Sequence, residues 1–206
     1  DNDNFNDFHI ITKAHLPIQQ TDDCDIIVFR SNNGINEYFC LLFGSARKLP
    51  KNQINYIPTI RIHSQCVTGD ILNSLKCDCG DQLKNSIDLM VKNKEGILIY
   101  LSQEGRNIGL TNKLRAYKLQ EEGLDTIDAN LMLGFEEDER SYEIAYHILK
   151  TLNVNSIKLI TNNPNKIKEL EKMGIKMIER ISVPTKSNPY NKNYLNTKKI
   201  KTGHYI

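Results

Sequence analysis

The sequence contains no tryptophan, and none of its apolar runs approaches the roughly 18 to 20 residues that a membrane-spanning helix needs. Its formal net charge is only +2, too small to indicate a nucleic-acid-binding coat. We therefore expect neither a membrane nor a nucleic acid as partner. No secretory signal is visible, and the cysteines are not distributed like a disulfide framework, so we expect the cytoplasm or another reducing compartment.

Several nucleotide-binding and catalytic signatures are also missing. There is no Walker A sequence and no G-x-G-x-x-G, so neither a P-loop nor a Rossmann-type site is supported. The nucleobase-deaminase signature requires His-x-Glu followed by Pro-Cys-x-x-Cys, whereas this chain has His63-Ser64-Gln65 and no proline before a later cysteine. These absences disfavour the three corresponding classes of protein.

The composition is that of a globular protein with one substantial core: 206 residues, 39% of them hydrophobic and 25% charged. The first residues are rich in Asn and Asp and offer little to bury. We expect a flexible tail over residues 1–13 and a single domain over residues 14–206.

Hydrophobic periodicity predicts an α/β fold, with a mixed β-sheet flanked by helices, an N-terminal β-hairpin region and a C-terminal βαβ unit. After Val183 the periodicity disappears, so we expect this last part to wrap the surface. The predicted elements are a hairpin over 25–44, a strand over 57–63, a helix over 81–93, a strand over 97–101, helices over 112–122 and 141–152, and the βαβ unit over 157–178.

Three of the five cysteines lie close together, as Cys66, Cys77 and Cys79, in the pattern C-x10-C-x-C. Thiolates are soft ligands that suit Zn²⁺, and three of them leave a fourth position open for water, as in catalytic zinc sites. Two alternatives remain at this point. His63 could close a structural zinc knuckle, or the cysteines could be unligated core residues.

Two further segments carry polar groups that suit a nucleotide. The loop SQEGRNIGL presents Glu104, a match for the paired donors of a guanine edge, and Arg106, a phosphate partner; the alternative is a solvated turn. Thr161 and Lys166 flank the start of a predicted helix, where the dipole favours anions; the alternative is an ordinary capped helix with an exposed lysine. Taken alone, the acidic segment 136–140 reads as charge at a helix N-terminus.

Taken in order and at their intervals, a set of linked motifs resembles the GTP cyclohydrolase II family from about Ala14 to His204. The resemblance implies a zinc enzyme that opens the imidazole ring of GTP, releasing formate, pyrophosphate and a diaminopyrimidine nucleotide, at the entry to riboflavin biosynthesis. It further implies that the domain over residues 14–206 is catalytic, that the protein is a homodimer and that Mg²⁺ binds with the triphosphate. The motifs are RIHSQCVTGD, KCDCGDQL, SQEGRNIGL, RAYKLQEEGLDT, DANLMLGF, DERSY, TNNPNK and the closing TGH.

The resemblance also implies roles for individual residues. Cys66, Cys77 and Cys79 match the zinc ligands, one zinc per chain, holding the water that attacks guanine C8. Asp138 and Arg140 match a proton acceptor and a nucleophile that attacks the α-phosphorus, and Tyr117 matches a catalytic tyrosine. The positions that match GTP contacts are Arg61, Ile62, His63, Ser64, Gln65, Gln82, Glu104, Gly105, Arg106, Thr126, Thr161 and Lys166.

This chain departs from the family pattern at two positions. The family usually has glutamate where Gln65 stands and arginine where Ser102 stands, so one negative and one positive charge are lost together. Two competing hypotheses remain: a zinc-stabilised GTP-binding module without catalysis, and a relative with altered ring chemistry that stops at a formylated pyrimidine or uses another purine nucleotide. The first would bind GTP and zinc but release no formate.

Overall fold

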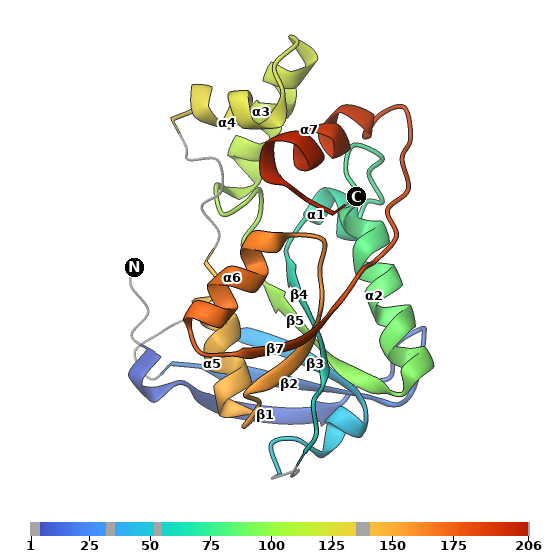
Figure 1. The fold of residues 1–206 in the computed structure, drawn as a ribbon, viewed down its shortest axis with the longest axis vertical. Helices are drawn as coiled ribbons and strands as arrows, with labels where there is room; N and C mark the ends of the chain where they lie inside the picture. Colours follow the sequence, from blue (N-terminus) through green and yellow to red (C-terminus); the bar gives the residue numbers. More distant parts are fainter. Residues whose placement is uncertain (1–4, 32–35, 52–54, 135–140, 206) are drawn as a thin grey trace.

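A seven-stranded sheet runs through the part of the chain that the computed structural model describes, in the order β1-β2-β3-β5-β4-β6-β7 (Figure 1). The described residues are 5–31, 36–51, 55–134 and 141–205, without the side chains of residues 6, 126, 130 and 202. The strands are β1 (His9–His15), β2 (Cys24–Arg30), β3 (Tyr38–Gly44), β4 (Thr59–Ser64), β5 (Glu95–Leu101), β6 (Ser156–Ile160) and β7 (Lys176–Ile181).

The sheet is mixed, and its two halves follow from their connections. β1, β2, β3 and β5 pair antiparallel, which confirms the predicted hairpin between β2 and β3. β5, β4, β6 and β7 pair parallel, and parallel neighbours need a crossover. α2 (Cys79–Asn93) connects β4 to β5, and α6 (Pro164–Lys172) connects β6 to β7, which confirms the predicted βαβ unit and the α/β class.

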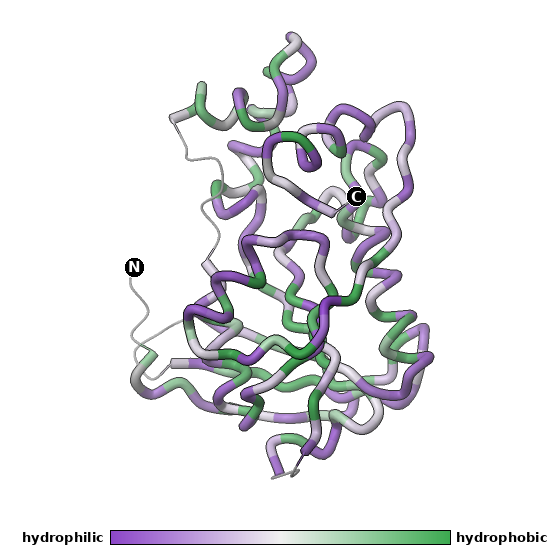
Figure 2. Tube along the Cα trace, in the orientation of Figure 1, coloured by the Kyte–Doolittle hydropathy of each residue, from purple (hydrophilic) through white to green (hydrophobic). Residues whose placement is uncertain are grey.

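Each face of the sheet packs against its own helices. Ile60 and Ile62 of β4 belong to the larger core cluster, which includes Ile148 and Leu149 of α5 (Glu143–Thr151). A second cluster contains Met90 of α2. Burial of each large aliphatic side chain contributes about 1.5–3 kcal/mol. Figure 2 shows hydrophobic stretches along the strands of the sheet.

Apolar and polar side chains alternate along β4, so they lie on opposite faces of the sheet. Successive side chains of a strand point to opposite faces, so Ile60 and Ile62 enter the core while Arg61 and His63 lie on the other face. These two polar side chains are nevertheless buried, because their face is covered near the N-terminal end of α2. The site is built on this face, where the parallel strands end.

Glu95 ties together the opposite ends of the three central parallel strands. Its carboxylate accepts hydrogen bonds from the backbone N–H of Thr59 at 3.1 Å, from the Tyr56 hydroxyl at 3.2 Å and from Lys158 Nζ at 3.2 Å. Burial raises the pKa of Glu95, but the hydrogen bonds from Thr59 and Lys158 outweigh it, so the pKa lies below its ordinary value. β4, β5 and β6 therefore start in a fixed register.

The structure corrects two expectations about the ends of the chain. The tail expected over residues 1–13 does not extend over His9–Lys13, because these residues belong to β1 and pair with β2. Phe8 stacks on Phe29 with ring centroids 5.6 Å apart, so this segment is anchored by partners far along the chain. At the other end, the segment expected to lack periodic structure contains the helix α7 (Lys192–Thr202).

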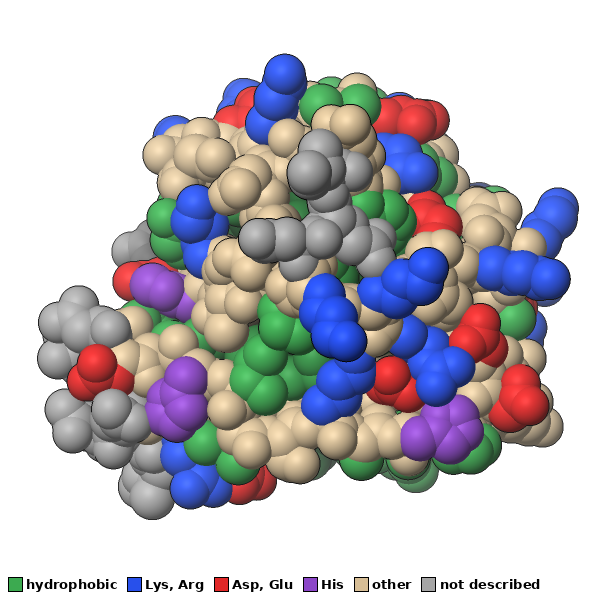
Figure 3. Space-filling model, turned by 90° about the horizontal axis from the view of Figure 1, so that it is seen from below, with side chains coloured by type: hydrophobic (Ala, Val, Ile, Leu, Met, Phe, Trp, Pro, Cys, Tyr) green, Lys and Arg blue, Asp and Glu red, His purple; other side chains and the backbone are tan. Residues whose placement is uncertain are grey.

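The remaining elements are short or lie at the end of the molecule where the parallel strands terminate. They are the 3-10 helices η1 (Phe5–Asp7) and η2 (Ser45–Lys48) and the helices α1 (Val67–Asp70), α3 (Gly109–Glu121) and α4 (Thr126–Met132). Among the described residues, no helix has both the length and the apolar character needed to span a bilayer. The face seen from below in Figure 3 carries basic, acidic and hydrophobic side chains interspersed.

Candidate active site

A pocket opens where the carboxyl ends of β4, β5 and β6 meet. Gln65 follows β4, Glu104 lies in the loop after β5, and Thr161 follows β6, and all three line the pocket. In open α/β sheets, ligands bind at this edge because several loops converge there. α2, α3 and α7 supply further side chains to the wall of the pocket.

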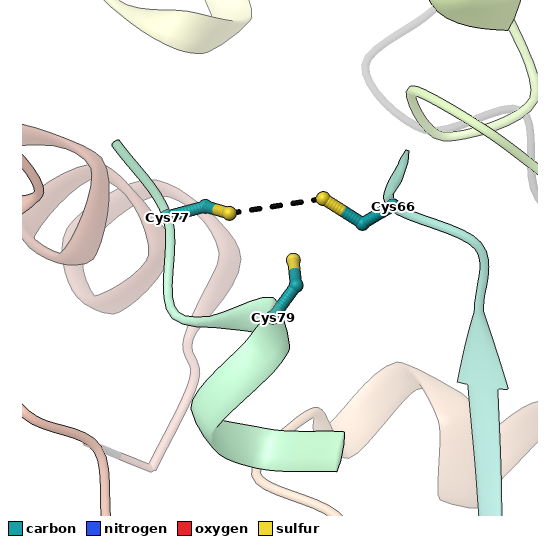
Figure 4. Close-up of side chains that lie close together, drawn as sticks. All are labelled: Cys66, Cys77 and Cys79. Carbon is teal, nitrogen blue, oxygen red and sulfur yellow. Dashed lines mark hydrogen bonds between the residues drawn. The ribbon is translucent and has the colours of Figure 1, made fainter. Parts of the chain in front are cut away.

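The three clustered cysteines converge inside this pocket (Figure 4). Cys66 precedes α1, Cys77 lies in the connecting loop and Cys79 is the first residue of α2. Their Sγ atoms all lie within 4.8 Å of one another, with 3.7 Å between Cys66 Sγ and Cys77 Sγ, and all three cysteines are free. Converging thiols of this number and spacing fit a zinc ion, which takes soft sulfur ligands.

Gly69 in α1 lies against the sulfur cluster. A Cβ atom added to Gly69 would be 3.0 Å from Cys77 Sγ and 3.1 Å from Cys66 Sγ. A Cβ on Gly80 in α2 would be 2.3 Å from the Gly69 carbonyl oxygen, so the two helices also touch through glycine backbones. A side chain at Gly69 would therefore crowd the sulfur atoms, and one at Gly80 would separate α1 from α2.

Lys113 on α3 connects the thiol of Cys66 to the loop after β5. Its Nζ lies 3.0 Å from Cys66 Sγ and 2.8 Å from Glu104 Oε1, while Glu104 Oε2 accepts the Val67 backbone N–H at 2.6 Å. Burial lowers the pKa of Lys113, but the hydrogen bonds to Cys66 and Glu104 outweigh it and raise the pKa above its ordinary value. Lys113 therefore stays charged next to the thiol cluster.

The three thiols differ in pKa because they lie against one another and against Lys113. Hydrogen bonds from Cys77 and Cys79, followed by the one from Lys113, hold the pKa of Cys66 far below its usual range. The hydrogen bond to Cys66 raises the pKa of Cys77 to about 11. Cys66 is therefore the thiol of the cluster that loses its proton most easily, and the thiolate is the form that binds metal.

His63 is engaged by protein partners at both ring nitrogens. Its Nε2 lies 2.9 Å from Asp70 Oδ1, and its Nδ1 lies 3.3 Å from the guanidinium of Arg61. The other oxygen of Asp70 accepts the Cys66 backbone N–H at 3.0 Å and the Tyr100 hydroxyl at 2.9 Å. Burial lowers the pKa of His63. Among the described residues, the side chains close enough together to hold a metal ion are the three cysteines, without His63. A knuckle closed by His63 is thus not what the structure shows.

Arg61 begins a chain of polar contacts that reaches Asp78, the residue between Cys77 and Cys79. Its guanidinium donates to Gln82 Oε1 at 2.7 Å, and the amide of Gln82 donates to Asp78, which stands between Cys77 and Cys79. Arg61 is only 6% exposed, and this burial lowers its pKa from the ordinary value. The contact fixes a cationic group on the floor of the pocket.

The segment after β6 is a capped helix start with a buried lysine. Asn163 caps α6 by accepting the Asn165 N–H at 3.0 Å, and the Thr161 hydroxyl oxygen accepts the Asn163 N–H at 3.0 Å. The N–H groups of Asn163 and Asn165 at this helix start are therefore already paired within the chain. Lys166 is not exposed: its Nζ donates to the Ile62 carbonyl at 2.8 Å and lines the pocket.

Several buried polar atoms around the pocket have no partner within the described part of the chain. Most such atoms in folded proteins are satisfied, so a group of them at one pocket suggests sites that a ligand fills. Those lining this pocket are Arg61 Nε, Ser64 Oγ, Gln103 Oε1 and Asn162 Oδ1.

Comparison with known proteins agrees with this geometry. The model of the family GTP cyclohydrolase II matches residues 9–182. The chain belongs to the GTP cyclohydrolase II family. A GTP cyclohydrolase-2 of Buchnera aphidicola is 47% identical over 95% of this chain and 96% of its own length. Those of Hamiltonella defensa (55% over 71% of this chain and 74% of the relative) and Pasteurella multocida (43% over 95% and 87%) are also similar. The chain is therefore an enzyme of this hydrolase family.

Most of the residues expected from the family pattern come together in the pocket. Ile62 does not line it; its side chain is fully buried in the core below. The side chain of Thr126 and the whole of Asp138 and Arg140 lie outside the described residues. The expected residues that line the pocket are Arg61, His63, Ser64, Gln65, Cys66, Cys77, Cys79, Gln82, Glu104, Gly105, Arg106, Tyr117, Thr161 and Lys166.

The sequence reasoning missed four residues that shape the site. Asp70 and Asp78 fall inside the family motifs, but nothing in the sequence distinguished them from ordinary surface carboxylates. Lys113 lies one helical turn before Tyr117 on α3, a spacing that could have indicated it. Lys198 carries no sequence signal, and only its contact with Asp78 reveals it.

The two departures from the family pattern lie side by side. The Gln65 N–H donates to the Leu101 carbonyl at 2.7 Å, so Gln65 and Ser102 follow neighbouring strand ends. We expect Gln65→Glu to lower kcat/KM about two- to fivefold, since it restores a charge without its partner, and Gln65→Glu with Ser102→Arg to recover the loss. Steady-state kinetics of the singles and the double check this; effects that simply multiply would contradict the pairing.

Proposed function

We propose that the protein is a zinc-dependent GTP cyclohydrolase II, which opens the imidazole ring of GTP and releases formate and pyrophosphate in the first step of riboflavin biosynthesis. The observation that carries this proposal is the convergence of three thiols, the loop bearing Glu104 and the buried Lys166 in one pocket. The family match and the names of the relatives support it.

Cys66, Cys77 and Cys79 would hold the zinc ion. Zinc in such a site supplies a hydroxide at neutral pH, because it lowers the pKa of a bound water to about 7. The protein fixes the three sulfur atoms from separate anchors: Asp70 holds the Cys66 backbone N–H at 3.0 Å, and α2 begins at Cys79. Lys113, 3.0 Å from Cys66 Sγ, offsets part of the negative charge of the thiolates.

The base and the phosphates would bind different side chains of the pocket. Glu104 already accepts from Val67, Gly105 and Lys113, so its main role here is to fix the loop. Gln103 Oε1 and Asn162 Oδ1 are buried acceptors without a partner in the described part of the chain, and they would accept from the N–H donors of a purine edge once these side chains turn into the pocket. The triphosphate would bind the basic and hydroxyl groups of Arg61, Thr161 and Lys166. Mg²⁺ would bind with it, chiefly through phosphate oxygens and water.

Tyr117 lines the same pocket from α3 and suits the role of proton donor. Burial raises its pKa to about 12, so the hydroxyl stays protonated at neutral pH. Asp138 and Arg140 keep the roles that the family resemblance implies, proton acceptor and nucleophile. Arginine has a pKa above about 12 and needs a carboxylate beside it to become nucleophilic. We also propose one catalytic domain, a homodimer and a cytoplasmic location.

One assay tests the proposed function. Purified protein is incubated with GTP and Mg²⁺, with and without a zinc chelator, and formate, pyrophosphate and the pyrimidine product are measured. We expect both leaving products from the wild type and loss of formate release with chelator. Cys77→Ser should lose zinc and activity, whereas Arg140→Ala should keep zinc and lose activity.

The other outcomes separate the competing hypotheses. Binding of GTP and zinc without formate would identify a non-catalytic binding module. Accumulation of a formylated pyrimidine would identify altered ring chemistry. Activity that survives complete removal of zinc would contradict the metal-dependent proposal.

A further inference from the structure

The last segment of the described chain, residues 183–205, reaches the pocket although the family match ends at residue 182. Both ends of this segment are hydrogen-bonded to Asn162. Asn162 Nδ2 donates to the Val183 carbonyl at 3.0 Å, and the Tyr205 N–H donates to the Asn162 carbonyl at 2.9 Å. The Arg180 guanidinium lies 4.4 Å from the centroid of the Tyr205 ring. The segment therefore leaves the sheet at β7 and returns to the pocket edge.

Between these anchors, α7 forms part of the pocket wall. In Figure 1 it lies near α1, α3 and α4, at the end of the molecule opposite β1. Tyr194 and Lys198 of α7 and the following His204 all line the pocket. Leu195 is buried on the same helix, so α7 packs against the body of the protein and is not merely laid on its surface.

The decisive contact of α7 is an ion pair with the loop that bears two of the thiols. Lys198 Nζ lies 2.7 Å from Asp78 Oδ1, and the Asp78 side chain is fully buried. A buried carboxylate is strongly destabilising without a charged or hydrogen-bonding partner. In the described part of the chain, Lys198 is the basic side chain that forms a salt bridge with Asp78.

Asp78 stands between Cys77 and Cys79, so its position fixes theirs. Its second carboxylate oxygen accepts the amide of Gln82, and Gln82 in turn accepts the Arg61 guanidinium at 2.7 Å. Without Lys198, Asp78 would be drawn toward solvent, and the peptide units on either side would carry both sulfur atoms with it. The ion pair thus connects a helix late in the sequence to the metal-binding loop 120 residues earlier.

We propose that α7 completes the active site and that Lys198 is a positioning residue, which holds Cys77 and Cys79 in the metal-binding arrangement through Asp78. Lys198 does not touch the metal or the reacting atoms in this role. The inference rests on the proposed function for the identity of the ion and the reaction, but its main readout is metal binding, which does not require turnover.

The test compares Lys198→Met with Lys198→Arg and with a control, Lys199→Met, one residue along on the exposed face. Zinc affinity is measured by competition with a chromogenic chelator, and the Co²⁺-substituted protein reports thiolate coordination by its absorption spectrum. Partners that orient metal ligands typically affect metal affinity about 10–100-fold. We expect Lys198→Met to lose affinity in this range with an altered Co²⁺ spectrum, Lys198→Arg to recover most of it, and the control to match wild type.

A double-mutant cycle with Asp78→Asn separates positioning from general damage. If Lys198 acts through Asp78, the double variant binds zinc no more weakly than the worse single, whereas additive losses would overturn the proposal. So would a Lys198→Met protein that unfolds more easily yet keeps wild-type zinc affinity and Co²⁺ spectrum. Lys198→Gln, without charge but still able to hydrogen-bond, gives the same comparison if the Met variant does not fold.

The same preparations keep the two proposals apart. Formate release from GTP by the wild type tests the proposed function. Metal affinity of the Lys198 variants tests the role of α7. A wild type that binds zinc but releases no formate would contradict the proposed function. The role of α7 would then still be decided by the zinc affinities of the Lys198 variants.

Discussion

Gly69→Ala is expected to weaken zinc binding by about tenfold or more and to lower formate release in proportion, with little change in the free energy of unfolding. The added Cβ would stand 3.0 Å from Cys77 Sγ and 3.1 Å from both Cys66 Sγ and Cys79 Cβ, closer than ordinary van der Waals contact. Gly69 lies in α1 with helical backbone, so the substitution adds no left-handed strain. The sulfur atoms must move apart instead, which changes the size of the metal site.

The measurement is zinc affinity by chelator competition, together with urea unfolding of each variant. Gly174→Ala is the control, because Gly174 has a φ of +96° and nothing within 4 Å of its added Cβ. We expect the control to lose stability and keep its zinc affinity. We expect Gly69→Ala to keep its stability and lose zinc affinity. Unchanged zinc affinity in Gly69→Ala would show that the thiol cluster tolerates the crowding.

Among these glycine variants, Gly44→Ala is expected to lose the most stability, about 3 kcal/mol or more in the free energy of unfolding. Gly44 ends β3 with φ +54° and ψ −120°, a conformation that residues with a Cβ rarely adopt. Its added Cβ would lie 1.9 Å from the carbonyl oxygen of Lys94 and 2.3 Å from the carbonyl carbon. Both are backbone atoms, so relief requires β3 to separate from the turn before β5.

Urea unfolding at constant pH measures this loss, again against Gly174→Ala. The control carries the strain of a positive φ without a clash, and replacement of such a glycine costs roughly 1 kcal/mol. The excess loss in Gly44→Ala is the part caused by contact with Lys94. Equal losses in the two variants would mean that the strands adjust freely at this corner.

The elements that the sequence predicted correctly are those with a strong local pattern. The helix expected over 81–93 is α2, and the strand expected over 97–101 lies within β5, since both carry clear periodicity between breakers. Edge strand β1 was missed because its exposed side chains give no alternation, and its order comes from pairing with β2. The helix α7 was missed for a related reason: its stabilising contacts, such as Lys198 with Asp78, are tertiary.

For the site, the sequence by itself determined which groups carry chemistry: three thiols in a spacing typical of metal ligands, a polar loop after a strand, and a lysine at a helix start. It did so because the identity of a side chain and its spacing from its neighbours can be read directly from the sequence. The tertiary structure decided which partners these groups have. It paired His63 with Asp70, buried Lys166 against the Ile62 carbonyl, and brought Lys198 to Asp78. The last two pairings join residues more than 100 positions apart. The energies of all three depend on burial and on charges that only the folded chain brings together.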